Sequence, residues 1–167
     1  MGAAIGAAVA AFRQVNAAVS ESLNLFKQQE QAERALEFAT NGNSAALIAQ
    51  AEALQKNSTI GDELIIQQQA YLASLGFTEE EINKVIQGSA DLAAANPNIS
   101  FEAAVRNLSK TYSGLTGELG EAIPQLREFT AEELKSGAAT EFIATEYEGY
   151  AKALSEGTGA MDQTANL

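Results

Sequence analysis

Residues 72–112 read LASLGFTEEEINKVIQGSADLAAANPNISFEAAVRNLSKTY, and this stretch decides the fold because it holds the start and stop signals of two helices. Thr78 is a good N-cap residue, and Glu81 three positions later can return a hydrogen bond, which together make a capping box. Phe77 before the cap and Ile82 after it have the spacing of a hydrophobic staple. The sequence therefore predicts a helix that begins directly after Thr78.

The same stretch predicts where this helix ends and the next one begins. Asn96-Pro97 should end the first helix, because a proline disfavours the helical conformation of the residue before it. Ser100 is the expected cap of the second helix, and apolar residues recur at helical spacing in both. The residues expected to face inward are Ile82, Val85, Ile86, Ala90 and Ala93 in the first helix and Phe101, Ala104, Val105, Leu108 and Tyr112 in the second.

Working outward from this pair, the sequence predicts an all-α protein, a helical bundle of about six helices with a long amphipathic helix at its N-terminus. No stretch shows the period-two alternation of a strand. We expect three parts: residues 1–41, called the arm below, a compact helical domain over 44–154, and a linker or truncated end over 155–167.

The arm carries an apolar stripe with a heptad-like spacing. Asn16 occupies a position of this stripe, where a single polar residue can fix the register of two paired helices. The pattern predicts self-association or contact with a partner, and packing of the stripe on the chain's own bundle is the alternative. The stripe consists of Ile5, Val9, Phe12, Val19, Leu23 and Phe26.

The remaining helices are placed by their own breaks and apolar residues. Asn41-Gly42-Asn43 should precede a short helix that ends near Lys56, and Gly76 should end a third helix. Residues 113–124, rich in glycine, are expected to be a loop, and Thr130 with Glu133 forms a second capping box that opens one last helix to Leu154. The residues expected to face inward are Leu64, Tyr71, Leu72 and Leu75 in the third helix and Ile143, Tyr147, Tyr150, Ala151 and Leu154 in the last.

Composition argues against several classes of function. The net charge is −12 and the ten basic residues are scattered, which argues against specific nucleic-acid binding and against an anionic membrane surface. Arg13 and Asn16 interrupt the apolar N-terminus before it reaches a membrane-spanning length, so we expect no stable membrane anchor in this segment. The chain has no cysteine and no histidine, which removes thiolate metal sites, the commonest metal ligand and the commonest general base. We expect no enzyme, no cofactor and no metal.

The remaining candidates for chemistry have simpler structural interpretations. The spacing of Gly114, Gly117 and Gly120 differs from a dinucleotide fingerprint, and no strand precedes these glycines. The run from Glu79 to Glu81 suits the first turn of a helix, where acidic residues interact favourably with the helix dipole. Three further acidic residues are expected on a solvated helix face rather than in an acid/base pair: Glu141, Glu146 and Glu148.

The order of these segments resembles the phage tail tape-measure proteins. Residues 75–80 match a Leu-Gly-aromatic-Thr-Glu-Glu turn and residues 90–93 an Ala-Asp-Leu-Ala helix end. Residues 100–105 match a Ser-x-Glu-Ala-Ala-Val helix start, and residues 129–138 resemble a segment of the type Leu-Thr-x-Glu-Glu-Leu-Lys-x-Gly-Ala, with Phe129 in place of its leucine. The resemblance covers about residues 50–154 and brings no catalytic residue with it.

This resemblance implies a structural role in the virion tail of a phage or prophage, assembled in the host cytoplasm. Proteins of this family fill the tail tube and set its length, so the implied partners are tail tube and tail-tip or baseplate proteins, together with further copies of the chain. Two alternatives stay open. One is a stand-alone acidic α-helical interaction or adaptor module, and the other is a small enzyme that uses carboxylates alone.

Overall fold

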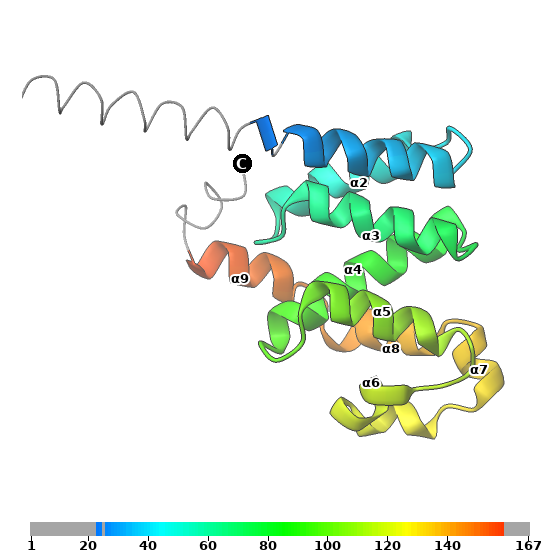
Figure 1. The fold of residues 1–167 in the computed structure, drawn as a ribbon. Coiled ribbons are helices and arrows are strands. Elements are labelled where there is room, and N and C mark those ends of the chain that lie inside the picture. Colours follow the sequence, from blue (N-terminus) through cyan, green and yellow to red (C-terminus); the bar gives the residue numbers. More distant parts are fainter. Residues whose placement is uncertain (1–22, 25, 159–167) are drawn as a thin grey trace, which may run out of the picture.

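The computed structural model describes residues 23, 24 and 26–158, and within this part it is all-α without a strand. The all-α prediction is confirmed, with more and shorter helices than the six expected. Residues 26–39 are helical and precede the labelled elements of Figure 1. The elements that follow are α2 (Ala45–Lys56), α3 (Asp62–Ser74), α4 (Glu79–Ala95), α5 (Phe101–Thr111), α6 (Gly117–Ala122), η1 (Pro124–Glu128), α7 (Ala131–Lys135), α8 (Ala138–Glu146) and α9 (Tyr150–Thr158).

Helix α4 is the centre of the bundle. It contacts α2 and α3 on one side and α5, α8 and α9 on the other, as Figure 1 shows. Val85, Ile86 and Leu92 of this helix are fully buried, and so is Leu108 of α5. A helix that is buried on several sides must be apolar around much of its surface, which explains why the segment that decides the fold is also the core.

The helix starts predicted from capping signals are confirmed. The Thr78 hydroxyl accepts from the Glu81 N–H at 3.3 Å, and the Glu81 carboxylate accepts from the Thr78 N–H at 2.8 Å. In the second box the Thr130 hydroxyl accepts from the Glu133 N–H at 3.3 Å, and the Glu133 carboxylate accepts from the Thr130 N–H at 2.7 Å. Ser100 caps α5 by accepting from the Ala103 N–H at 3.2 Å. These contacts span three residues, so local sequence is enough to predict them.

The prediction of a loop over residues 113–124 is wrong for the second half of this range. Helix α6 begins at Gly117 and is followed by the 3₁₀ helix η1. Leu119, Ile123 and Leu126 are buried in the core, with 1%, 4% and 0% of their surface exposed. Three apolar residues at helical spacing therefore outweigh the low helix propensity of the glycines between them.

The single last helix expected from Thr130 to Leu154 is in fact three helices. Gly137 and Gly149 adopt positive φ values of 92° and 80°, which interrupt the chain between α7, α8 and α9. The break at Gly149 turns α9, so that Tyr150 and Leu154 are exposed at 50% and 39% instead of facing inward. Helix α9 also runs beyond Leu154 to Thr158, and Ser155 is buried, so residues 155–158 are helix rather than linker.

The inward face of α3 also differs from the prediction. Tyr71 and Leu75 are exposed at 37% and 53%, so their predicted inward position is wrong, whereas that of Leu72 is confirmed. Ile65 and Gln69, which were not predicted to face inward, are completely buried together with Leu72. These three residues lie on the side of the helix that contacts α2 and α4. Gln69 is accommodated because its amide donates to the Leu47 carbonyl at 2.8 Å.

Candidate functional site

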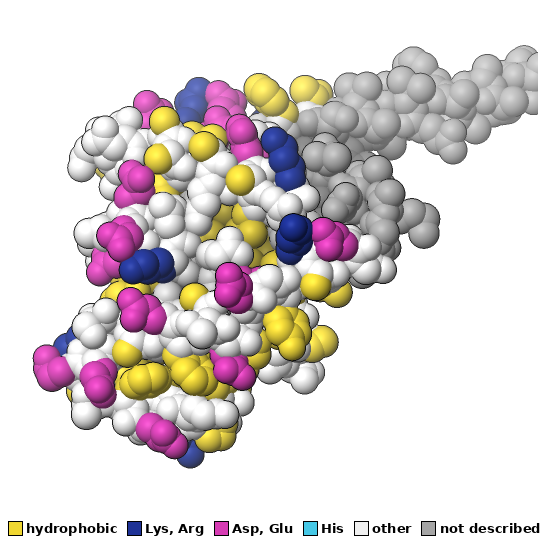
Figure 2. Space-filling model, turned by 180° about the vertical axis from the view of Figure 1, so that it is seen from behind, with side chains coloured by type: hydrophobic (Ala, Val, Ile, Leu, Met, Phe, Trp, Pro, Cys, Tyr) yellow, Lys and Arg dark blue, Asp and Glu magenta, His cyan; other side chains and the backbone are white. Residues whose placement is uncertain are grey.

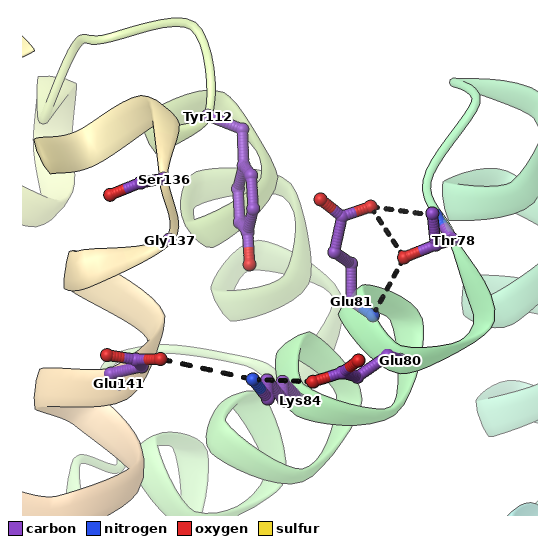
Figure 3. A pocket seen from close by; sticks show the side chains of 8 residues that line it. All are labelled: Thr78, Glu80, Glu81, Lys84, Tyr112, Ser136, Gly137 and Glu141. Atoms are coloured by element: carbon purple, nitrogen blue, oxygen red, sulfur yellow. Dashed lines mark hydrogen bonds and ion pairs between the residues drawn. The ribbon is translucent and has the colours of Figure 1, made fainter. Parts of the chain in front are cut away.

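A polar pocket of about 240 Å³ lies where the start of α4, the end of α5 and the α7–α8 turn meet. Figure 3 shows its side chains, which come from all three places. The pocket brings together residues that are far apart in the sequence, and its grouping of Lys84, Tyr112 and Glu141 was not predicted. Its lining consists of Thr78, Glu80, Glu81, Lys84, Tyr112, Ser136, Gly137 and Glu141.

The carboxylates of this pocket are engaged in structural contacts. Glu81 holds the cap of α4, with its Oε2 atom 2.9 Å from the Thr78 hydroxyl as well as 2.8 Å from the Thr78 N–H. Glu80 lies 3.0 Å from the Lys84 ammonium, and Glu141 of α8 lies 3.9 Å from it (Figure 3). The expectation that residues 79–81 serve the helix start therefore fits the geometry, and Glu141 has a partner that the sequence did not indicate.

Lys84 and Tyr112 keep their protons at neutral pH. The hydrogen bond from Lys84 to Glu80 raises the pKa of the lysine above its usual value of 10.5, and the charge of Glu141 acts in the same direction. Burial raises the pKa of the Tyr112 phenol, whose ring packs edge-on against Phe77 with centroids 4.8 Å apart. Lys84 is therefore a cation and Tyr112 a neutral phenol. Neither has the pKa near neutrality that suits a general base.

A second hollow, of about 490 Å³, lies between α2, α4 and the α8–α9 turn. Its most buried polar residue is Asp91, which is only 3% exposed. One Asp91 oxygen accepts from the backbone N–H of Ala151 at 2.9 Å, and the other accepts from the Gln87 amide at 3.0 Å. Asp91 thus caps the first turn of α9 from a helix 60 residues earlier. This is a structural role that local sequence signals could not reveal.

Metal ligation and membrane insertion find no support in the described part of the chain. No group of three or more histidine, cysteine, aspartate or glutamate side chains is arranged to hold a metal ion there. No helix within the same residues combines the length and the apolar character that crossing a bilayer requires. The face shown in Figure 2 carries scattered acidic side chains and only isolated basic ones, so it offers no basic patch for a nucleic acid.

The apolar stripe of the arm is described only at its C-terminal end. Ile5, Val9, Phe12 and Val19 lie outside the described residues. Leu23 and Phe26 are exposed at 53% and 65%. Further along the same helical segment, Phe38 is exposed at 89%, the most of any large apolar residue described. Apolar surface of this extent is a sign of an interaction surface.

Comparison with known proteins does not identify a relative. No protein-family model, no curated protein and no solved structure matches this chain.

Proposed function

We propose that this chain is a structural component of a phage or prophage tail, of the tape-measure kind, and that it has no catalytic role. The proposal rests on one observation, the ordered succession of helix-boundary motifs over residues 75–138. Capping boxes at Thr78 and Thr130 lie within two of these motifs, so the motifs correspond to actual helix starts.

Within such a protein, residues 44–154 would serve as a docking domain rather than as the ruler. A ruler needs extended helix, which gives about 1.5 Å of length per residue. Helix α4, the longest helix in the described part of the chain, has 17 residues and spans about 25 Å, and the helices around it fold back on one another. A compact bundle contributes little axial length, so we assign it to contacts at one end of the tail tube. Its partners would be tail tube and tail-tip or baseplate proteins.

An in-frame deletion of residues 44–154 from the parent gene tests this assignment. We expect few or no assembled tails in electron micrographs, because the docking surfaces are lost. A matched deletion of equal length from a continuous helical part of the same gene should instead give shorter tails in normal numbers. Normal numbers of infectious particles from the 44–154 deletion, with tails shortened by the full helical length, would refute the docking role.

A stand-alone acidic interaction module is the second candidate. The exposed side chains of Phe38 and Leu115, at 89% and 67%, favour a protein that binds partners through apolar contacts. The two candidates differ in where the protein is found. Mass spectrometry of purified tailed particles should detect this chain if it is a tail component, and its absence from complete particles would favour the adaptor.

A further inference from the structure

A third hollow, of about 420 Å³, lies at the side of the bundle where two helices end. These are the helical segment over residues 26–39 and helix α3, and Figure 1 shows both ending on the same side of the molecule. The chain that leads into α2 and the start of α4 complete the lining. Every residue of this lining belongs to the described part of the chain, so the hollow can be built from the structure itself.

The floor of the third hollow is apolar. Leu47 and Ile82, each only 1% exposed, belong to the core of the bundle, and Phe77 packs against that core. Two strongly exposed apolar residues adjoin the lining in the chain. Leu75, at 53%, lies between two lining residues, and Phe38, at 89%, directly precedes another. An apolar hollow with such neighbours is a sign of a surface that another molecule covers.

The charges at this hollow are negative. Among the described residues, Glu79 is the only charged one in the lining, and it forms no ion pair with a described lysine or arginine. The C-terminal ends of two helices add partial negative charge, whereas the N-terminus of α4 carries glutamates of its own. The first pocket differs, because Lys84 there neutralises Glu80 and Glu141. In the third hollow the complementary cation must come from another molecule.

Charge and shape together select a basic side chain as the group that fills the hollow. A second copy of the chain carries the same net charge of −12, so two copies repel each other. Lysine and arginine lay a long apolar stem along apolar surface and keep the charged end in polar surroundings. The hollow offers an apolar floor for the stem, and it offers Glu79 and two helix ends for the charge.

We propose that the third hollow docks a basic segment of a partner protein. The stem of one lysine or arginine of this segment lies on Leu47 and Ile82, and its charged end meets Glu79. Apolar residues beside it in the partner segment cover Leu75 and Phe38. The docking does not depend on the proposed role in a tail, and its failure would leave that role untouched.

Fluorescence anisotropy of a labelled amphipathic peptide of leucine and lysine, titrated with the full chain, is the first test. We expect binding that weakens several-fold between about 0.05 M and about 0.3 M salt, because salt screens ion pairs at an exposed site. The same peptide with glutamate in place of lysine should not bind. Absence of binding by the lysine peptide, or equal binding by the glutamate peptide, would overturn the proposal.

Substitutions locate the site, because an acidic protein attracts a basic peptide over its whole surface. Ala73→Phe places a large side chain in the third hollow and should weaken binding at least about tenfold. Ala144→Phe is the matched control, since it makes the same change at a partly buried alanine of the second hollow, and it should bind like the wild type. Circular dichroism checks that both variants fold. Unchanged binding by Ala73→Phe, or an equal loss in both, would contradict docking in this hollow.

Glu79→Gln keeps the shape of the side chain and decides the question even if Ala73→Phe does not fold. It should weaken binding about two- to fivefold, the range for a partly exposed ion pair. Glu118→Gln is the matched control, because it also removes an exposed acidic residue from the first turn of a helix but lies outside the hollow. Equal effects of the two would show attraction to net charge alone and would refute the site.

Sedimentation equilibrium of the wild-type chain tests the other occupant of the hollow. We expect the 17.5 kDa mass of one chain for contacts made through this surface, in the wild type and in Ala73→Phe alike. A wild-type mass of two chains that falls to one in Ala73→Phe, but not in Ala144→Phe, would show that a second copy fills the hollow and would overturn the proposal.

Discussion

Replacing Asp91 with alanine should loosen the attachment of α9 to the centre of the bundle. The substitution removes the acceptor for the Ala151 N–H, which lies 2.9 Å from the carboxylate in a residue that is only 3% exposed. A buried donor without a partner costs about 1–3 kcal/mol, and loss of a helix N-cap costs about 0.5–2 kcal/mol. Both figures describe the same hydrogen bond and are not added. The Gln87 amide is exposed and can turn to water.

We therefore expect Asp91→Ala to lower the free energy of unfolding by about 2 kcal/mol. Asp91→Asn keeps an acceptor oxygen and loses only the charge, so its cost should be about half as large. Glu52→Ala is the matched control, because it removes a carboxylate from an exposed position of α2 and should change stability by less than about 0.5 kcal/mol.

Urea unfolding followed by circular dichroism at 222 nm measures these differences. Hydrogen exchange gives a local reading, since the Ala151 amide should exchange about 30-fold faster in Asp91→Ala if opening of α9 costs 2 kcal/mol less. If Asp91→Ala were as stable as Glu52→Ala and its Ala151 amide equally protected, the capping role of Asp91 would be refuted.

Four further substitutions test local features of the fold. Thr78→Ala should cost about 0.5–2 kcal/mol by removing the cap of α4, and an unchanged urea midpoint would mean that the capping box adds nothing. Gly137→Ala should destabilise by at least about 1 kcal/mol, because φ is +92° and the new Cβ would lie 3.1 Å from a tyrosine oxygen. Gly88→Ala should stabilise α4 by about 0.5–1 kcal/mol, because the new Cβ would lie at an ordinary 3.5 Å from an isoleucine methyl group. Urea unfolding measures both glycine variants, and equal changes in their free energy of unfolding would contradict the opposite signs expected for them. The backbone hydrogen bond from Thr130 lowers the pKa of Glu133, so this carboxylate adds stability above its unfolded-state pKa of about 4.3 and loses it as the pH falls through the folded pKa. The stability difference between wild type and Glu133→Gln should therefore shrink below about pH 4.3, and a difference that stayed constant down to pH 2 would exclude the linkage.

The candidate surfaces differ in how far the sequence could predict them. The heptad spacing of the arm is visible in the sequence, and the exposure of Leu23 and Phe26 is consistent with an apolar interaction surface at that end of the stripe. The pocket of Figure 3 had no such signal, because Lys84, Tyr112 and Glu141 come from three helices with no pattern connecting them. A periodic face can be read from one helix, whereas a pocket depends on how several helices meet.

The all-α class and the starts of α4, α5 and α7 could be predicted from local sequence, because a cap and its helix lie within four residues of each other. The end of α4 before Asn96-Pro97 could be predicted in the same way, because a proline acts on the conformation of the residue directly before it. The helix over the glycine-rich residues 117–122 depends on tertiary packing, because burial of Leu119 in the core outweighs the low helix propensity of these glycines. The same dependence on packing explains a contact that local sequence could not indicate. Asp91 lies at the N-terminus of α9 only because the folded bundle brings α4 and α9 together, since the hydrogen bond joins residues that are 60 positions apart in the sequence.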